Sequence, residues 1–394
     1  FMDAYQAIKE KSEQYFKEMV KYRRHLHQFP ELSFQEYETT KYIQSILKSL
    51  DIPVEKPMKT GCIGVLKGDI ESDKVVALRA DIDALPIEEK GEHKQDFISR
   101  FPGVAHCCGH DIHTANLLGS AAILSDLREQ IEGTVLLVFQ AAEERLPGGG
   151  RLLCETGFLQ DRGVQAIYGL HTNPNYKPGE IGVRNGAFMA RPDEFEIEVR
   201  GTGGHAAAPH ETVDPIVIAS QLITAIQTVV SRNVDPNAPA VVTVGRMEGG
   251  SAHNIIPERV RIFGTIRTFS GKLSHLISSR LEQLTHGICE SMGAKGTFEL
   301  NEGYPAVINT DWCVDNLREA ASRIIDEQNV INMQKPIMAG EDFAFYQKEF
   351  PGTFFFLGSG SEQSGSVYSW HHPRYNVDEE CLKTGSAVMA SAAL

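Results

Sequence analysis

Apolar residues recur at helical intervals in two segments at the start of the chain, which predicts two opening helices. The first segment spans residues 5 to 26 and the second spans residues 43 to 50. Short, continuous apolar runs follow at 75–78, 134–139 and 166–170, with a helical segment at 114–128. Continuous rather than alternating runs are typical of strands that are covered on both faces. We therefore expect an α/β fold with a mostly parallel central sheet flanked by helices.

The pattern changes between about residues 187 and 300. Residues 194–200 alternate between apolar and polar, and a helix is expected from Asp214-Pro215, an N-cap residue followed by a first-turn proline. Two strands, a helix at 273–292 and a strand at 297–300 come next, and the resulting β-α-β-β-α-β order is ferredoxin-like. Because the α/β pattern then resumes, we expect a discontinuous first domain of residues 1–186 and 301–394, with residues 187–300 inserted into it.

Composition narrows the classes of partner. The chain has 394 residues, more than one core usually organises, and 52 acidic against 38 basic residues give a formal net charge of −14. This charge opposes binding to nucleic acid or to anionic membranes. No apolar run approaches the roughly 20 residues that span a bilayer, and no secretory signal is evident. Seven scattered cysteines do not resemble a disulfide framework. We expect a soluble, cytoplasmic protein with reduced cysteines.

The densest chemistry lies in the eight residues His106-Cys107-Cys108-Gly109-His110-Asp111-Ile112-His113. Two further candidates, Glu143-Glu144 and His171, each come directly after a short apolar run. In an open α/β sheet, ligands bind beyond the carboxyl ends of the strands, so these groups are expected to meet at one edge. Taken singly, a histidine after a strand is more often a loop or capping residue, and paired glutamates are usually solvated. Their joint placement favours a site.

The ligand types indicate a transition metal. Mixed cysteine, histidine and glutamate ligands favour zinc, manganese, nickel or cobalt over calcium or magnesium. Cys108 and His110 stand two apart, so in an extended segment they would point to the same side and leave Cys107 as a neighbour that is not a ligand.

Motifs in the same order resemble a known family along nearly the whole chain. They are His27-Gln28-Phe29-Pro30-Glu31-Leu32, Arg79-Ala80-Asp81-Ile82-Asp83, Cys108-Gly109-His110-Asp111-Ile112-His113, Gln140-Ala141-Ala142-Glu143-Glu144, Gly203-Gly204-His205-Ala206, Gly340-Glu341-Asp342-Phe343 and His371-His372-Pro373. The chain is similar to the metal-dependent amidohydrolases of the aminoacylase and carboxypeptidase superfamily, nearest to hippurate hydrolases, auxin-conjugate hydrolases and acetyldiaminopimelate deacetylases. The resemblance implies a catalytic domain with an inserted ferredoxin-like lid through which the protein forms a homodimer.

The resemblance also implies roles for individual residues. It implies a two-metal site with the ligands Cys108, His110, Glu144, His171 and His371. Cys108 would take the place that other branches give to a bridging aspartate. Glu143 matches the general base, which would take a proton from a metal-activated water. The groups expected to orient the ligands are Asp81, Asp83 and His113.

Three further positions match substrate contacts of the family. His205 would stabilise the tetrahedral oxyanion, often from the partner subunit, although the residue alone is better explained as a loop histidine. Asn254 and Arg267 match positions that hold the substrate carboxylate, a task that suits the planar guanidinium of arginine. Gly340 is a candidate for lining the pocket, although this glycine could equally serve a helix start.

The function that the resemblance implies is hydrolysis of an N-acyl-L-amino acid to a free amino acid and a carboxylic acid. One alternative is a dipeptidase or aminopeptidase on the same two metals. Another is a metal-dependent binding protein that has lost catalysis, and against it stands Glu143, a group that such a protein has no need to keep.

Overall fold

The computed structural model describes residues 4–394, which divide into two compact units. The first unit contains the residues up to Phe188, together with Ile308–Pro336 and Asp342–Leu394. The second contains Met189–Val307 and Ile337–Glu341. Residues 301–307 and 337–341, which the sequence pattern placed with the first domain, therefore group with the second unit. Backbone bonds from Ala190 N to the carbonyl oxygens of Ile337 and Ala339 tie the second of these stretches to it.

An eight-stranded sheet forms the centre of the first unit, with the strand order β1-β2-β4-β3-β5-β16-β6-β15. The strands are β1 (Val54–Glu55), β2 (Cys62–Lys67), β3 (Ile70–Asp81), β4 (Glu132–Gln140), β5 (Ala166–Asn173), β6 (Ile181–Val183), β15 (Val330–Asn332) and β16 (Gly352–Gly358). The four central strands β4, β3, β5 and β16 run parallel, whereas β2 pairs antiparallel with β4. Every residue of β5 and of β16 is buried, so the predicted mostly parallel sheet with covered strands is confirmed.

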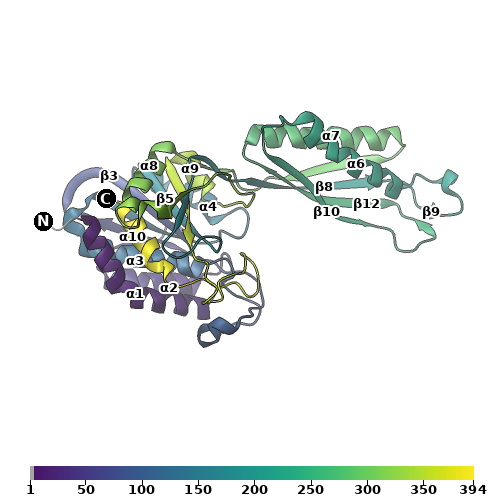
Figure 1. Ribbon diagram of the computed structural model, residues 1–394. Helices are drawn as coiled ribbons and strands as arrows, with labels where there is room; N and C mark the ends of the chain where they lie inside the picture. Colours follow the sequence, from purple (N-terminus) through teal and green to yellow (C-terminus); the bar gives the residue numbers. More distant parts are fainter. Residues whose placement is uncertain (1–3) are drawn as a thin grey trace. The chain divides into compact units, whose positions relative to one another are not determined.

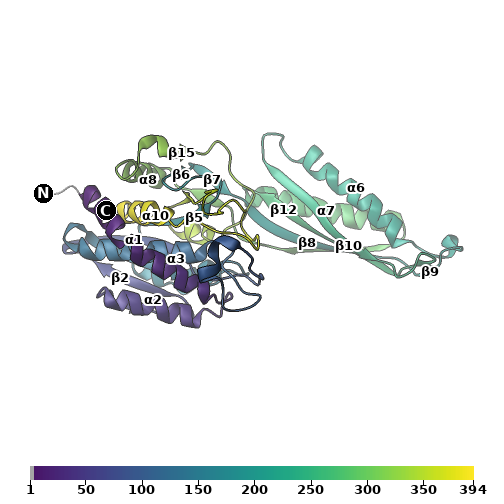
Figure 2. The ribbon, with the colours of Figure 1, turned by 60° about the horizontal axis from the view of Figure 1, so that its bottom comes forward.

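Helices cover this sheet. They are α1 (Ala4–Gln28), α2 (Tyr37–Ser49), α3 (His110–Asp126), α4 (Gly149–Glu155), α5 (Phe158–Asp161), α8 (Asp311–Ser322), α9 (Ala344–Glu349) and α10 (Cys381–Ala392), with the 3-10 turns η1 (Glu92–Phe97), η2 (Arg128–Gln130) and η4 (Glu327–Asn329). The helices α1, α3 and α10 pack against one another and lie side by side in Figure 2. All residues of α3 from His110 to Leu124 are buried, so this part of the helix has no solvent-exposed face.

A four-stranded antiparallel sheet with the order β10-β12-β8-β13 forms the second unit. Its elements are β8 (Arg191–Arg200), β9 (Gly204–His205), η3 (Pro209–Glu211), α6 (Pro215–Asn233), β10 (Ala240–Gly249), β11 (Ile255–Ile256), β12 (Arg259–Thr268), α7 (Gly271–Ser291) and β13 (Lys295–Asn301). Both long helices lie on the same face of the sheet (Figure 1). This arrangement is ferredoxin-like. The short strands β7 (Gly186–Met189) and β14 (Val307–Asn309) pair with each other.

Two hydroxyl or carboxyl side chains start the helices of the second unit. Asp214 accepts a hydrogen bond from Ile216 N at the start of α6, and Ser270 accepts one from Leu273 N at the start of α7. By length and composition α6 is also apolar enough to cross a membrane, which differs from the expectation that no apolar segment is long enough. Its buried residues Ile218, Leu222, Ile226 and Val229 nevertheless belong to the core of the second unit.

Candidate metal centre

Three parallel strands bring the candidate groups to one edge of the sheet. The strand β3 ends at Asp81 and β4 ends at Gln140, while His171 lies near the carboxyl end of β5. Asp81 and His171 are therefore inside strands rather than in the loops after them, because both strands extend further than their apolar runs. Asp83 and the pair Glu143-Glu144 follow in the loops.

Gly109 determines how Cys108 and His110 are presented. Its φ of 95° is left-handed, and α3 begins at the next residue. A Cβ atom at position 109 would come within 2.4 Å of Thr172 Oγ1, so conformation and space both require glycine. The expectation that Cys108 and His110 share one extended segment is wrong. A turn, rather than the alternation of a strand, brings the two side chains to the same place.

Two groups of potential ligands share Cys108. The first comprises Cys108, His110 and His171, and the second comprises Cys108, Glu144 and His371. Within each group, one ligand atom from every residue lies within 4.8 Å of the others. The distances include 3.3 Å from Cys108 Sγ to His171 Nε2 and 3.1 Å from His371 Nε2 to Glu144 Oε1. All five residues that the family resemblance proposed as ligands are thus brought together.

Glu143 lies beside these groups. Its carboxylate falls within 4.8 Å of ligand atoms of His110 and Glu144, and its residue is 6% exposed. Its Oε1 also lies 3.4 Å from Asp342 N, which donates a hydrogen bond to it. The candidate base is therefore close to the candidate ligands, and the backbone amide of Asp342 holds its carboxylate.

Two buried carboxylates orient histidines of the centre. Asp83 Oδ1 lies 3.1 Å from His110 Nδ1, which leaves Nε2 of that ring directed at the ligand groups. Asp81 Oδ1 lies 2.6 Å from His113 Nδ1, while His113 Nε2 accepts a hydrogen bond of 2.9 Å from Thr172 N. The second pair therefore holds the backbone immediately after His171. Such carboxylate partners fix the tautomer and the ring orientation of histidines at metal sites.

The sequence predicts no role for Arg79, and the structure places this residue at the centre of a charge network. Its guanidinium donates to Asp81 Oδ2 at 2.8 Å, to Asp342 Oδ1 at 2.7 Å and to Gln140 at 2.8 Å, all fully buried. An arginine directly after the apolar run 75–78 is the signal that could have identified it, because a buried cation requires an anionic partner.

Trp370 is a second residue that the sequence did not single out. Its indole N–H donates to the Thr172 carbonyl oxygen at 2.8 Å, and the same oxygen lies 2.8 Å from His171 Nδ1. The indole ring also contacts the His171 ring with 4.9 Å between centroids. The orientation of His171 is thus fixed by one carbonyl and one aromatic side chain. Nothing in the sequence spacing indicates this contact.

The chemistry of the donor set fits divalent cations. His110 Nε2 is buried and has no hydrogen-bond partner within residues 4–394. Burial lowers the pKa of His110, but Asp81, Asp83 and Glu144 together raise it to about 10, so a positive charge is favoured at this place. Burial and the two glutamates raise the pKa of the Cys108 thiol well above its usual value. A cation would reverse that shift, since a coordinating thiol is deprotonated.

The remaining members of the cysteine and histidine cluster are not ligands in either group. Cys107 is buried and its carbonyl oxygen accepts a hydrogen bond of 2.7 Å from His371 N. His371 itself has a left-handed φ of 63°, unusual for a residue with a side chain. All seven cysteines are free, as expected.

The other proposed functional residues belong to the second unit. His205, in β9, is exposed, and its Nδ1 accepts a hydrogen bond of 3.0 Å from Ala207 N. Asn254 lies next to it, because its carbonyl oxygen accepts from Ala206 N at 3.2 Å. Arg267 is a residue of β12, and burial lowers the pKa of its guanidinium. A Cβ atom on Gly340 would meet the ring of Pro192 at 2.5 Å, so packing within the unit accounts for this glycine.

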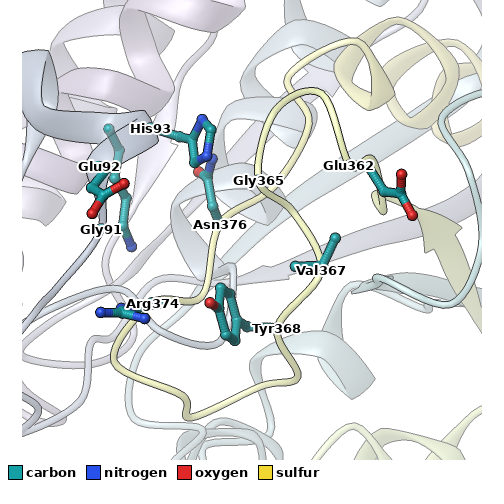
Figure 3. A pocket seen from close by; sticks show the side chains of 10 residues that line it. Gly91, Glu92, His93, Glu362, Gly365, Val367, Tyr368, Arg374 and Asn376 are labelled. Carbon is teal, nitrogen blue, oxygen red and sulfur yellow. The ribbon is translucent and has the colours of Figure 1, made fainter.

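A pocket of about 500 Å³ lies in the first unit (Figure 3). Its lining comes from η1 and from the loop before α10, and includes His93, Tyr368, Arg374 and Asn376. None of the five candidate ligands lines it, although Tyr368 and Arg374 flank His371 in sequence.

Comparison with known proteins agrees with this geometry. The profile of Peptidase family M20/M25/M40 matches residues 77–394. An N-acetyl-L-cysteine deacetylase of Bacillus subtilis (strain 168) is 40% identical over 378 residues, covering 96% of this chain and 88% of that protein. An N-acyl-L-amino acid amidohydrolase of Geobacillus stearothermophilus is 43% identical over 295 residues, covering 75% and 78%. The crystal structure of the Bacillus subtilis YxeP protein, a dinuclear metal-binding peptidase of the M20 family, superimposes with a TM-score of 0.83 at 36% identity, covering 97% of this chain and 98% of that one.

Proposed function

Because this chain belongs to Peptidase family M20/M25/M40, we propose that it hydrolyses the amide bond of N-acyl-L-amino acids, releasing a free amino acid and a carboxylic acid. The observation that carries the proposal is the pair of ligand groups sharing Cys108, with the Glu143 carboxylate beside them. The names of the deacetylase and amidohydrolase relatives support the substrate class.

In this proposal, Cys108, His110 and His171 would hold one divalent cation, and Cys108, Glu144 and His371 would hold a second. Zinc, manganese, nickel and cobalt all suit these ligands. When bound, such cations lower the pKa of water and polarise a carbonyl group. The Cys108 thiolate would contribute to both groups, which is the role that a bridging carboxylate plays elsewhere.

Glu143 moves the proton. Its carboxylate accepts a proton from the attacking water as the new C–O bond forms at the substrate carbonyl. It then passes that proton to the amide nitrogen as the C–N bond breaks, so that the amine leaves neutral. The hydrogen bond from Asp342 N to Oε1 helps to hold the carboxylate in place.

The family resemblance suggests substrate-binding roles for residues of the second unit. His205 is proposed to stabilise the oxyanion, and Asn254 and Arg267 to hold the carboxylate of the amino-acid moiety, since a guanidinium binds carboxylate through two hydrogen bonds. Gly340 is proposed to line the substrate pocket.

We further propose a cytoplasmic homodimer formed through the second unit. The exposed residues of α6 up to Ser231 are all uncharged, and they include Ile216 at 39% and Val217 at 48% exposure. Apolar and neutral polar side chains are typical of surfaces that a second copy covers.

A screen of the metal-reconstituted protein tests the proposed function. The substrates are N-acetyl, N-benzoyl and longer acyl derivatives of several amino acids, with dipeptides as the competing class. We expect turnover of acyl-amino acids that exceeds turnover of dipeptides bearing a free amino group. Preferred cleavage of dipeptides would assign the peptidase reaction instead, and a protein inert toward every substrate with each of the four metals would refute the proposal.

A further inference from the structure

Glu36 occupies the N-cap position of α2, yet its side chain does not cap that helix. N-cap side chains ordinarily accept a hydrogen bond from the first turn of their own helix. Here the carboxyl group is fully buried, and its Oε1 accepts a hydrogen bond of 2.8 Å from Ala142 N, more than 100 residues along the chain. The Glu36 carboxylate therefore binds the loop that follows β4 rather than its own helix.

Ala142 has an unfavourable backbone conformation. Its φ of 53° is left-handed, a region that residues with a Cβ atom rarely adopt. The residue is fully buried, and its carbonyl oxygen accepts a hydrogen bond of 2.9 Å from Gly149 N. A conformation of this kind persists only where surrounding contacts enforce it. Glu36 supplies the contact at the amide, and Gly149 supplies the contact at the carbonyl.

The turn at Ala142 immediately precedes Glu143. After Glu143, the next amide is held in the same manner, since Glu144 N donates to Asp83 Oδ2 at 3.0 Å. Two buried carboxylates from different parts of the chain therefore hold the amides of the two residues that flank the candidate base, Ala142 and Glu144. Glu36 holds the amide of Ala142 and Asp83 holds the amide of Glu144, so each carboxylate holds one end of the turn.

We infer that Glu36 is a positioning residue for Glu143: it keeps Ala142 in its left-handed conformation and thereby aims the base. The inference rests on the proposed function, because it assigns Glu36 a part in proton transfer through Glu143. Asp83 also binds His110, so a substitution there would disturb a candidate ligand. Glu36 is proposed to act on Glu143 through its hydrogen bond from Ala142 N.

The charge of Glu36 is not what the loop requires. Burial, followed by the charge of Asp83, raises the pKa of Glu36 to about 7. A carboxyl group accepts the Ala142 hydrogen bond through Oε1 whether or not it is ionised. Glutamine presents the same acceptor in nearly the same volume, whereas alanine presents none.

The test compares Glu36→Gln, Glu36→Ala and Glu36→Ala/Ala142→Gly in the metal-reconstituted full chain, with Glu38→Ala as the control. The Glu38 side chain is 72% exposed on the same helix. Two quantities are measured for each variant with its metal content: kcat and KM for an N-acyl amino acid, and amide hydrogen exchange of the peptide containing residues 141–144. Exchange is also followed in the metal-free proteins.

For Glu36→Ala we expect faster exchange of this peptide, a kcat lower by about 10- to 100-fold, a KM within about threefold and unchanged metal content. Glu36→Gln and the Glu38 control should behave as wild type. Glycine adopts positive φ without a steric penalty, so the double variant should recover kcat by about fivefold or more. A merely structural role would not produce this split between kcat and KM or this rescue.

Unchanged exchange or kcat in Glu36→Ala would overturn the inference, as would a Glu36→Gln variant impaired as strongly as Glu36→Ala, or an absence of rescue by Ala142→Gly. If Glu36→Ala does not fold, Ala142→Val replaces it, because a β-branched residue disfavours positive φ more strongly. That variant should exchange faster and lose kcat, and wild-type behaviour would contradict the inference. Wild-type protein that hydrolyses no acyl-amino acid would refute the proposed function. The exchange measurement would still show whether Glu36 holds the loop at Ala142.

Discussion

The Sγ atom of Cys108 lies 3.3 Å from Nε2 of His171, although 63 residues separate them in the sequence. Sulfur and nitrogen atoms that share a tetrahedral zinc ion are roughly 3.5 Å apart, given bond lengths of about 2.3 and 2.0 Å. The loop before α3 and the strand β5 therefore bring these two atoms to nearly the separation that a shared cation needs. Cys108 also belongs to the group with Glu144 and His371, so one thiol connects both halves of the centre.

The adjacent cysteines provide a matched pair of variants. Cys108→Ser should weaken metal binding by more than about 100-fold, because it replaces a donor in both groups. Loss of a residue that only hydrogen-bonds to a ligand typically weakens metal binding by about 10- to 100-fold. Cys107→Ser should leave affinity within about threefold, since the contact of Cys107 with His371 is made by its carbonyl oxygen. Chelator competition with elemental analysis measures both. Equal losses in the two variants would be inconsistent with Cys108 as the shared ligand.

Glu143→Gln tests proton transfer without disturbing the ligands. The carboxamide keeps an oxygen for the hydrogen bond from Asp342 N but cannot accept the proton of water. We expect full metal content and a kcat lower by about 100-fold or more, as for loss of a general base. Glu144→Gln is the comparison and should lose metal as well as turnover. Activity of Glu143→Gln near that of wild type would remove Glu143 from the mechanism.

Asp83→Asn should weaken metal binding through His110. The aspartate accepts from His110 Nδ1 and from Ser33, so it fixes the ring with Nε2 toward the ligand groups. Loss of such a carboxylate typically lowers metal affinity by about 10- to 100-fold. Isothermal titration with zinc measures the change, and Ser33→Ala, which removes only the hydroxyl partner, should have a smaller effect. An Asp83→Asn protein with wild-type affinity would show that His110 needs no such partner.

Acid stability should depend on Glu89. Its Oε1 lies 2.6 Å from both His27 Nε2 and Lys94 Nζ, and the carboxylate is 3% exposed. Burial raises the pKa of Glu89, but the hydrogen bond from His27 and the charges of His27 and Lys94 outweigh burial and lower it to about 2 from 4.5.

Because the folded pKa is lower than the unfolded one, Glu89 stabilises the protein fully above about pH 4.5 and loses this effect as the pH falls toward 2. Glu89→Gln should destabilise the first unit by about 3 kcal/mol at pH 7, since Lys94 would then be buried without its counter-charge. Thermal unfolding between pH 7 and pH 2 measures the difference. The gap between variant and wild type should narrow below pH 4.5, and a constant gap would exclude the ion pair as its cause.

The oligomeric state should depend on the exposed surface of α6. Sedimentation velocity at micromolar concentration should give the mass of a dimer. Val217→Glu, which places a charge on an exposed apolar position of that surface, should shift the protein toward the monomer. Leu276→Glu, on the exposed side of α7, should not. A monomeric wild-type protein would count against His205 acting on a partner's substrate.

Much of the architecture could be predicted from the sequence because periodicity reports burial. The continuous runs at 134–139 and 166–170 correspond to β4 and β5, in which residues 135–140 and 166–173 are all buried. The alternation of apolar and polar residues in β8, where Phe195, Ile197 and Val199 are buried, predicted a sheet with one solvent-exposed face. The family motifs also directed attention to the residues that the structure brings together around Cys108.

Other features depend on contacts that no local pattern records. The start of α3 at His110 was missed because the left-handed turn at Gly109 is set by the space beside Thr172. The hydrogen bond from Ala142 N to Glu36 and the contact of Trp370 with His171 join segments far apart in the chain. Residues 337–341 group with the second unit through backbone bonds to Ala190 rather than through sequence proximity.

The central claim is that Cys108 joins two cation sites, and anomalous diffraction from crystals of the metal-loaded protein tests it most directly. The account predicts two anomalous peaks per subunit, one contacting His110 and His171, the other contacting Glu144 and His371, with Cys108 Sγ bound to both. A single peak, or two peaks without a shared contact to Cys108, would contradict it.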